Sequence, residues 1–203
     1  AGGVDALVIE TMSDLDEDRI NDILMRSILN KGFEETYTGV VFPFLRRVGI
    51  MWHTGSVDIG SEHFVSNIFR KRLILAIDTL TPPERPDSRK FIMYLPEGEL
   101  HEMGLLFFTY MIRKEGHNVL YLGQSTPFNG LQDLVERWHP DFLVTGALTS
   151  LPFGKPEDYL RRISTSFRDQ TIFVGGVLAL HAGKMSLKNV VPFDSFNSLK
   201  QHL

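Results

Sequence analysis

The spacing of hydrophobic residues changes character once along the chain. Before residue 81, apolar positions recur at intervals of three and four, which is typical of amphipathic helices. This spacing predicts helices over about residues 14–30, 33–53 and 58–80, with a short helix before residue 14. Asp14 or Asp16 is placed to cap the first of the three long helices, and Ser56 or Asp58 the last. Four such helices predict a helical bundle.

After residue 88 the pattern becomes an alternation of short apolar runs and amphipathic segments. Strands are expected at residues 91–95, 119–122, 142–148 and 172–174, with a weak one near Val190. Helices are expected at 103–113, 131–138 and 156–167, and at the C-terminus. This alternation predicts a Rossmann-like, doubly wound parallel sheet, and the chain as a whole is assigned to the α/β class. Ligands of such sheets bind at the carboxyl ends of the strands.

A charged segment with three prolines, residues 81–88, separates the two patterns. Proline fixes φ and removes a backbone donor, so we interpret this segment as a linker. The expected domains are a helical bundle over residues 4–81 and a Rossmann-like domain over residues 89–203. Residues 1–3, Ala-Gly-Gly, have the composition of an appended segment, and we leave them out of the predicted fold.

Composition narrows the classes of function. Of the 203 residues, 43% are hydrophobic and 23% charged, as in ordinary globular proteins, and no apolar run has the length of a membrane span. Without cysteine, disulfides and thiolate metal sites are excluded. The net charge of −4 and the lack of a basic stripe argue against direct nucleic-acid binding by this chain. With no secretory leader, we expect a cytoplasmic protein without membrane contact.

One candidate for metal chemistry follows the first predicted strand. Glu99-x-His101-x-x-Gly104 lies on the loop that leads into the next helix. Imidazole is a good ligand for a transition metal, and a carboxylate two positions away can hold its other ring nitrogen. Glycine at position 104 would let a bulky planar ligand approach the backbone. A solvated loop histidine beside a glutamate is the alternative.

Small residues follow two later strands. Gly146, Thr149 and Ser150 lie in the loop after the third strand, and Gly175-Gly176 after the fourth. Both positions belong to the expected ligand edge, where small side chains would leave a slot. Alternatively, the glycines make only tight turns.

The bundle contributes a second group of candidates. Trp52-His53 ends the second long helix, and Glu62-His63 begins the third. An antiparallel helix pair brings both positions to one end of the bundle. Trp52 offers a broad apolar face with one donor, although it could equally cap the bundle core.

Together these motifs resemble those of a known family. Glu99-x-His101-x-x-Gly104, the loop at Gly146 and Gly175-Gly176 are similar to the cobalamin-binding signature of methionine-synthase type. Trp52, followed after nine residues by Glu62-His63, resembles the cap signature of the light-sensing, MerR-type repressors known as CarH or LitR.

The resemblance implies a function and a role for each residue. In that family a helical bundle covers the upper face of adenosylcobalamin, and the Rossmann-like domain holds the lower face. It implies that His101 is the lower cobalt ligand, that the nucleotide tail enters beside the glycines, and that Trp52, Glu62 and His63 shape the adenosyl pocket. His53 matches the histidine that takes the upper cobalt position after photolysis. A homo-oligomer is also implied, and DNA binding only through an N-terminal helix-turn-helix outside this chain.

One departure and two alternatives remain. Corrinoid proteins usually carry serine where Gly146 stands, and the nearby hydroxyls are those of Thr145, Thr149 and Ser150. The favoured function is a photoreceptor and gene regulator that is not an enzyme. A corrinoid carrier for methyl transfer shares the two-domain build, and a regulator that senses another signal is the third possibility. The cap residues favour the first.

Overall fold

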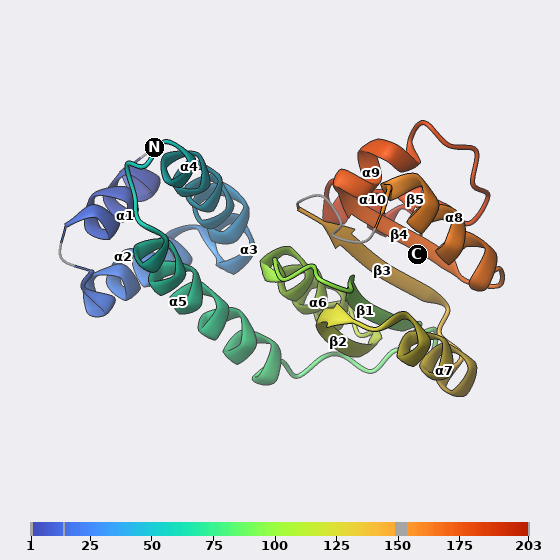
Figure 1. The fold of residues 1–203 in the computed structure, drawn as a ribbon. Helices are drawn as coiled ribbons and strands as arrows, with labels where there is room; N and C mark the ends of the chain where they lie inside the picture. The colour runs from blue at the N-terminus through green and yellow to red at the C-terminus, as the bar shows by residue number, and fades with distance from the viewer. Residues whose placement is uncertain (1, 14, 149–153, 203) are drawn as a thin grey trace. The chain divides into compact units, whose positions relative to one another are not determined.

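The protein is described here from a computed structural model that covers residues 2–13, 15–148 and 154–202, without the side chains of residues 2, 12 and 53. The chain divides into two compact units, Ala1–Leu75 and Ala76–Leu203, called here the helical unit and the sheet unit (Figure 1). The division falls inside a helix, a few residues before the proline-rich segment. The domain bounds expected from the sequence, 4–81 and 89–203, stay a prediction.

The helical unit is built from amphipathic helices around an apolar core. Its elements are α1 (Gly2–Met12), α2 (Glu17–Lys31), α3 (Phe33–Thr36), η1 (Tyr37–Val41), α4 (Phe42–His53) and most of α5 (Ile59–Asp78). Asp16 caps α2 by accepting hydrogen bonds from two backbone N–H groups, and Asp58 accepts from the backbone N–H of Ser61 at the start of α5. Leu24, Phe44 and Phe69 are fully buried in the core.

A π-helical turn interrupts the single helix expected over residues 33–53. The turn, η1, lies directly before α4, whose second residue is Pro43. A proline inside an α-helix removes an N–H donor and crowds the carbonyl four residues earlier, and a wider turn relieves both effects. The buried Tyr37 Oη donates to the Phe69 carbonyl oxygen at 2.9 Å, which ties the π turn to α5. The sequence pattern therefore located the helix but not the irregularity within it.

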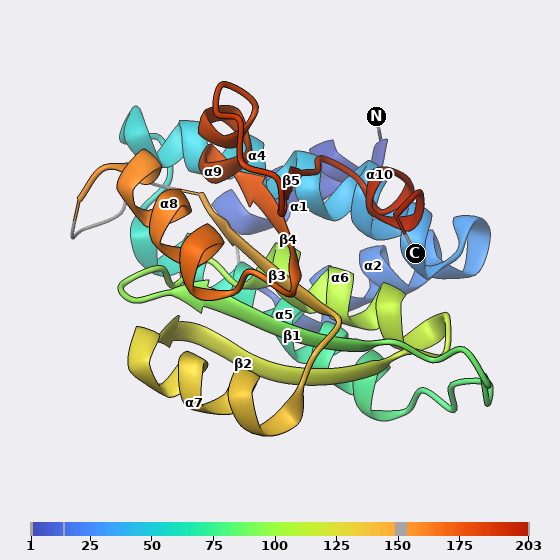
Figure 2. The ribbon, with the colours of Figure 1, turned by 90° about the vertical axis from the view of Figure 1, so that its right-hand side faces the viewer.

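The sheet unit is the expected α/β fold. Five strands form an all-parallel sheet in the order β2-β1-β3-β4-β5: β1 (Lys90–Pro96), β2 (Asn118–Thr126), β3 (Phe142–Ala147), β4 (Thr171–Gly176) and β5 (Val190–Pro192) (Figure 2). The helices are α6 (Met103–Lys114), α7 (Phe128–Trp138), α8 (Pro156–Ser166), α9 (Val177–Ala182) and α10 (Phe196–Lys200). The short helix α9 was not predicted, because six residues are too few to show a clear helical period.

The two faces of the sheet bury different clusters. Ile92, Tyr94 and Val174 pack with residues of α7, α8 and α9, whereas Met93, Val144 and Phe173 pack with residues of α6 and α10. Alternating residues of a strand point to opposite faces, which explains why consecutive residues of β1 enter different clusters. Both faces are covered, as is usual for parallel sheets.

The end of the proline-rich segment is fixed to the sheet unit. Arg85 donates from Nη1 to the Glu115 carbonyl oxygen at 3.1 Å, and Ser88 Oγ donates to the Gly116 carbonyl oxygen at 3.0 Å. Burial, with the nearby Arg85 guanidinium, lowers the pKa of His117, whose Nδ1 accepts from the Arg89 N–H at 3.2 Å. This part of the expected linker is therefore docked rather than free.

The first residues of the chain belong to the helical unit. Gly2 and Gly3 form the first turn of α1, so leaving them out of the fold was wrong. A Cβ on Gly3 would lie 3.3 Å from the side chain of Val40, which shows how closely this turn packs.

Among the helices of the described residues, none is long and apolar enough to cross a bilayer.

Candidate functional site

The loop with the predicted metal ligand lies at the switch point of the sheet. β1 has β2 on one side and β3 on the other, so the connections after β1 and β3 lead away in opposite directions. This arrangement opens a crevice at the carboxyl ends of the two strands, where ligands of such sheets bind. His101 lies on the loop after β1, and Leu148 is the first residue after β3.

Glu99 joins these two connections. Its Oε1 accepts from the backbone N–H of His101 at 2.9 Å and lies 2.6 Å from His101 Nδ1. Its Oε2 accepts from the backbone N–H of Leu148 at 2.8 Å. The Glu99 side chain is 2% exposed, so these charge-assisted bonds are shielded from water and hold the loop to the end of β3.

The same carboxylate determines which nitrogen of His101 faces a ligand. An ionised carboxylate can only accept, so the ring nitrogen at 2.6 Å carries the proton. Nε2 is then the nitrogen with a lone pair for a metal, and the His101 side chain is 53% exposed. The expected contact between Glu99 and the second ring nitrogen is thus present. Metal ligation by His101 itself stays a prediction.

The end of β2 supports the loop from its other side. Gln124 Nε2 donates to the Leu100 carbonyl oxygen at 2.6 Å, and the Ser125 N–H donates to the Glu99 carbonyl oxygen at 3.0 Å. The buried Glu102 accepts from Tyr121 Oη at 2.5 Å. Sequence reasoning missed these supports, since they come from a strand that is distant along the chain and contains no recognisable motif.

The glycines of the predicted slot lie opposite each other on β3 and β4. Gly146 pairs with Gly175, and a Cβ on Gly146 would lie 3.4 Å from the Gly175 carbonyl oxygen. By strand alternation, Gly146 and Gly175 share the α6 and α10 face with Val144 and Phe173. Gly176 has φ +62°, and its Cβ would lie against the Ala147 carbonyl oxygen, so only glycine fits there.

Gly104 differs from these glycines because packing does not require it. It is the second residue of α6, and a Cβ there would meet nothing within 4 Å. Space beside a helical glycine near His101 is what a broad planar ligand would use. Thr149 and Ser150, the candidate hydroxyls of the loop after β3, lie outside the described residues.

The predicted site residues of the helical unit lie on either side of the short connection between α4 and α5. Trp52 lies in the last turn of α4 and is 44% exposed, a large apolar surface to leave in water. Glu62 and His63 lie near the start of α5, with His63 Nδ1 3.8 Å from Glu62 Oε2; the side chain of His63 is 64% exposed and that of Glu62 29%. His53 ends α4, and its side chain lies outside the described residues.

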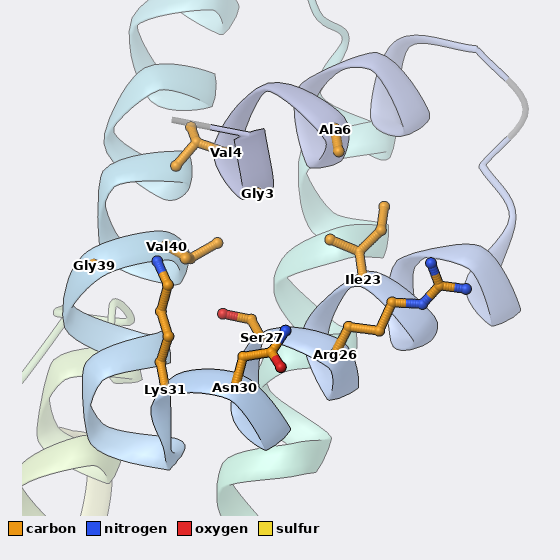
Figure 3. Close-up of a pocket in the computed structure, with 10 residues that line it drawn as sticks. All are labelled: Gly3, Val4, Ala6, Ile23, Arg26, Ser27, Asn30, Lys31, Gly39 and Val40. Carbon is orange, nitrogen blue, oxygen red and sulfur yellow. The ribbon is translucent and has the colours of Figure 1, made fainter.

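A cavity of about 290 Å³ in the helical unit lies elsewhere, between α1, α2 and η1 (Figure 3). Val4 and Ile23 form apolar walls, and Ser27, Asn30 and Lys31 of α2 add polar groups. None of the predicted site residues lines this cavity, so it is not the adenosyl pocket expected from the sequence.

Comparisons with known proteins bear on this site. Residues 7–76 match the B12 binding domain family, which indicates a cobalamin-binding domain. The chain is 30% identical over 165 residues to the "HTH-type transcriptional repressor CarH" of Myxococcus xanthus, covering 81% of this chain and 54% of that protein. It is 28% identical over 166 residues to the repressor CarA of the same organism, covering 80% of this chain and 54% of CarA. The resemblance to CarH-type repressors is confirmed, and the chain spans about half the length of these curated relatives.

A solved structure shares the fold. The monomethylamine corrinoid protein of Methanosarcina barkeri matches with a TM-score of 0.76 at 13% identity, covering 100% of this chain and 95% of that one. At this identity the match supports the Rossmann-like fold alone.

Proposed function

We propose that this chain is the sensory part of a light-responsive transcription regulator of CarH type, with adenosylcobalamin as chromophore. The match to the B12 binding domain family and the resemblance to two repressors support this proposal. The cofactor would supply a light-labile cobalt–carbon bond, and the chain would bind and orient it without catalysing a reaction. DNA binding would belong to a separate helix-turn-helix, and switching to a change in a homo-oligomer.

The observation that carries the proposal is the bonding of Glu99. A cobalamin would need an imidazole of the protein to hold its cobalt. His101 meets that need because Glu99 holds Nδ1 at 2.6 Å and directs the Nε2 side of the ring away from the carboxylate. Carboxylate partners of this kind fix the tautomer of a ligating imidazole and raise its basicity.

The surroundings of His101 also fit a corrinoid. Gly104 leaves open space on α6, where a Cβ would meet nothing within 4 Å. Gly146 and Gly175 remove two side chains from the face of the sheet that α6 and α10 cover. We propose that the lower face of the corrin rests by Gly104, and that the nucleotide tail passes the glycines of β3 and β4. Thr149, Ser150 and Gly176 would border the tail.

The adenosyl form and the response to light depend on the helical unit. Trp52 would cover the adenosyl group with its exposed indole face, and Glu62 and His63 would hydrogen-bond its polar atoms. His53 would replace the adenosyl group on cobalt after illumination. These assignments rest on the family resemblance and on the exposure of Trp52 beside the turn that also leads to Glu62.

Titration with hydroxocobalamin and adenosylcobalamin, followed by absorption spectra before and after green light, tests the proposal. His101→Ala should weaken cobalamin binding by more than the about 10–100-fold that loss of a partner of the ligand costs, and should change the spectrum, because the cobalt would lose its proposed protein ligand. His139→Asn, at an exposed position with φ 49° that asparagine tolerates, is the matched control. Equal affinity and an equal spectrum for His101→Ala would refute the ligand assignment.

The same titration separates the regulator from a methyl carrier. A photoreceptor should prefer adenosylcobalamin and change its spectrum irreversibly in green light. A carrier should bind methylcobalamin at least as well. Failure to bind any cobalamin would reject both functions.

A further inference from the structure

The sheet unit contains a second cavity that the proposed function does not use. It has a volume of about 580 Å³ and lies between the end of β1, the start of α7 and the first turns of α8. This volume is within the range of small-molecule sites, about 300–1,000 Å³. Tyr94 of β1 and Tyr159 of α8 form its polar wall, and Leu131 of α7 an apolar one.

This cavity lies across the sheet from the glycine slot. Tyr94 and Leu131 belong to the cluster that packs with α7, α8 and α9. Gly146 and Gly175 face the other side, where Gly175 approaches Phe193 and the α6 and α10 cluster. A ligand in the cavity would therefore be separated from a nucleotide tail in the slot by the sheet itself.

Two tyrosine hydroxyls line the cavity and contact each other. Tyr159 Oη donates to Tyr94 Oη at 3.2 Å, and Tyr94 is 1% exposed. Burial raises the pKa of Tyr94 to about 12, so this phenol stays protonated and can donate. Thr145 is 2% exposed and lies behind the two phenols rather than in the cavity lining; it is close enough to lower the pKa of both, although its Oγ1 makes no hydrogen bond of good geometry with a described residue. A ligand hydroxyl that reached Tyr94 and Tyr159 would extend this chain of hydrogen bonds.

The remaining lining residues carry balanced charge and one aromatic surface. Lys155 and Arg162 contribute two cations, and Glu97 and Asp158 two carboxylates. The Arg162 guanidinium lies 3.6 Å from the centroid of the Phe128 ring, which places a cation beside an aromatic face. A zwitterionic ligand would complement both the cations and the carboxylates of the lining. A planar apolar group in the same ligand would complement the ring of Phe128.

We propose that this cavity binds an aromatic α-amino acid with a ring hydroxyl. The carboxylate would pair with Lys155 and Arg162, and the ammonium group with Glu97 and Asp158. The ring would pack by Phe128 and Leu131, and its hydroxyl would hydrogen-bond with Tyr94 and Tyr159. Such a site gives the chain a small-molecule input on the face of the sheet opposite to the glycine slot.

Calorimetric titration with L-tyrosine and three analogues tests each part of this recognition. Tyramine lacks the carboxylate, 3-(4-hydroxyphenyl)propionate lacks the ammonium group, and L-phenylalanine lacks the hydroxyl. Each analogue should bind about tenfold more weakly, because each leaves one set of polar groups without its partner. Amide chemical shifts should change at residues 94–98, 126–131 and 154–162, equally with and without bound cobalamin.

Two substitutions and a neighbouring control complete the test. Arg162→Gln should remove the preference for L-tyrosine over tyramine, and Tyr94→Phe should reduce its preference over L-phenylalanine. Arg161→Gln, at the adjacent exposed position outside the cavity, should change neither. No saturable binding of L-tyrosine at millimolar concentration, or shifts centred on His101 instead, would overturn the proposal. Because the titration also uses the cobalamin-free chain, its result is independent of whether cobalamin binds.

Discussion

Replacing Glu99 with glutamine changes few atoms and tests the whole arrangement around His101. The carboxylate serves three donors with two oxygens: the N–H and Nδ1–H of His101 at Oε1, and the N–H of Leu148 at Oε2. Glutamine keeps one acceptor oxygen and presents an NH₂ group at the other position. In one orientation the NH₂ opposes the Leu148 N–H, and in the other it opposes both donors of His101.

Either orientation leaves a buried donor facing another donor. Glu99 is 3% exposed, so water cannot readily restore the lost bond. An unsatisfied buried donor costs about 1–3 kcal/mol, and the loss of a charged acceptor places Glu99→Gln toward the upper end of that range. For the sheet unit, residues 76–203, each kcal/mol lowers Tm by roughly 4 °C.

The effect on cobalamin has a separate cause. When the NH₂ faces His101, Nδ1 must accept, and the ring proton moves to Nε2, where it blocks metal binding. Loss of such a carboxylate partner weakens metal binding about 10–100-fold. Glu99→Gln should therefore lower both the Tm of the cobalamin-free chain and its affinity for hydroxocobalamin.

Thermal unfolding followed by circular dichroism and a spectroscopic cobalamin titration measure the two effects. Glu97→Gln is the matched control, since Glu97 is exposed and lies on the same loop. An unchanged Tm would show that the three hydrogen bonds do not hold the loop. If Tm falls as expected but the affinity for hydroxocobalamin does not change, the tautomer of His101 does not affect cobalamin binding.

Three further changes address other parts of the chain. Trp52→Ala should leave hydroxocobalamin binding intact but reduce the preference for adenosylcobalamin, and a fully retained preference would contradict the role of Trp52. Illuminated wild type loaded with adenosylcobalamin should give a bis-histidine spectrum that resists added cyanide, whereas His53→Ala should give an exchangeable product; identical products would remove His53 from the switch. Gly116→Ala should lower the free energy of unfolding in urea by about 2–3 kcal/mol, because φ is +86° and the new Cβ would lie 2.6 Å from the Pro83 carbonyl oxygen. Gly130→Ala is the control: its Cβ would meet nothing within 4 Å, so its stability should be unchanged or slightly higher. If the two glycine variants are equally stable, the proline-rich segment can move away from residue 116 without a loss of stability.

Much of the architecture could be predicted from local pattern. Helical and strand periods located the long elements, because burial of one face repeats at fixed intervals in both kinds of structure. Asp16 and Asp58 were among the candidate caps, since a short acceptor side chain before an amphipathic run has few other roles. The spacing of Glu99 and His101 indicated a contact that depends only on a short stretch of backbone.

Other features required the assembled fold, for reasons of distance and packing. Only the placement of β1 beside β3 brings the Leu148 N–H to Glu99 across 49 positions of sequence. The helical period over residues 33–53 did not show the π turn, whose buried Tyr37 contacts α5 through a hydrogen bond to Phe69, 32 positions away. The second cavity has no motif at all. Its residues come from three segments, and only the packing of α7 and α8 on one face of the sheet leaves their hydroxyls and charges around a common space.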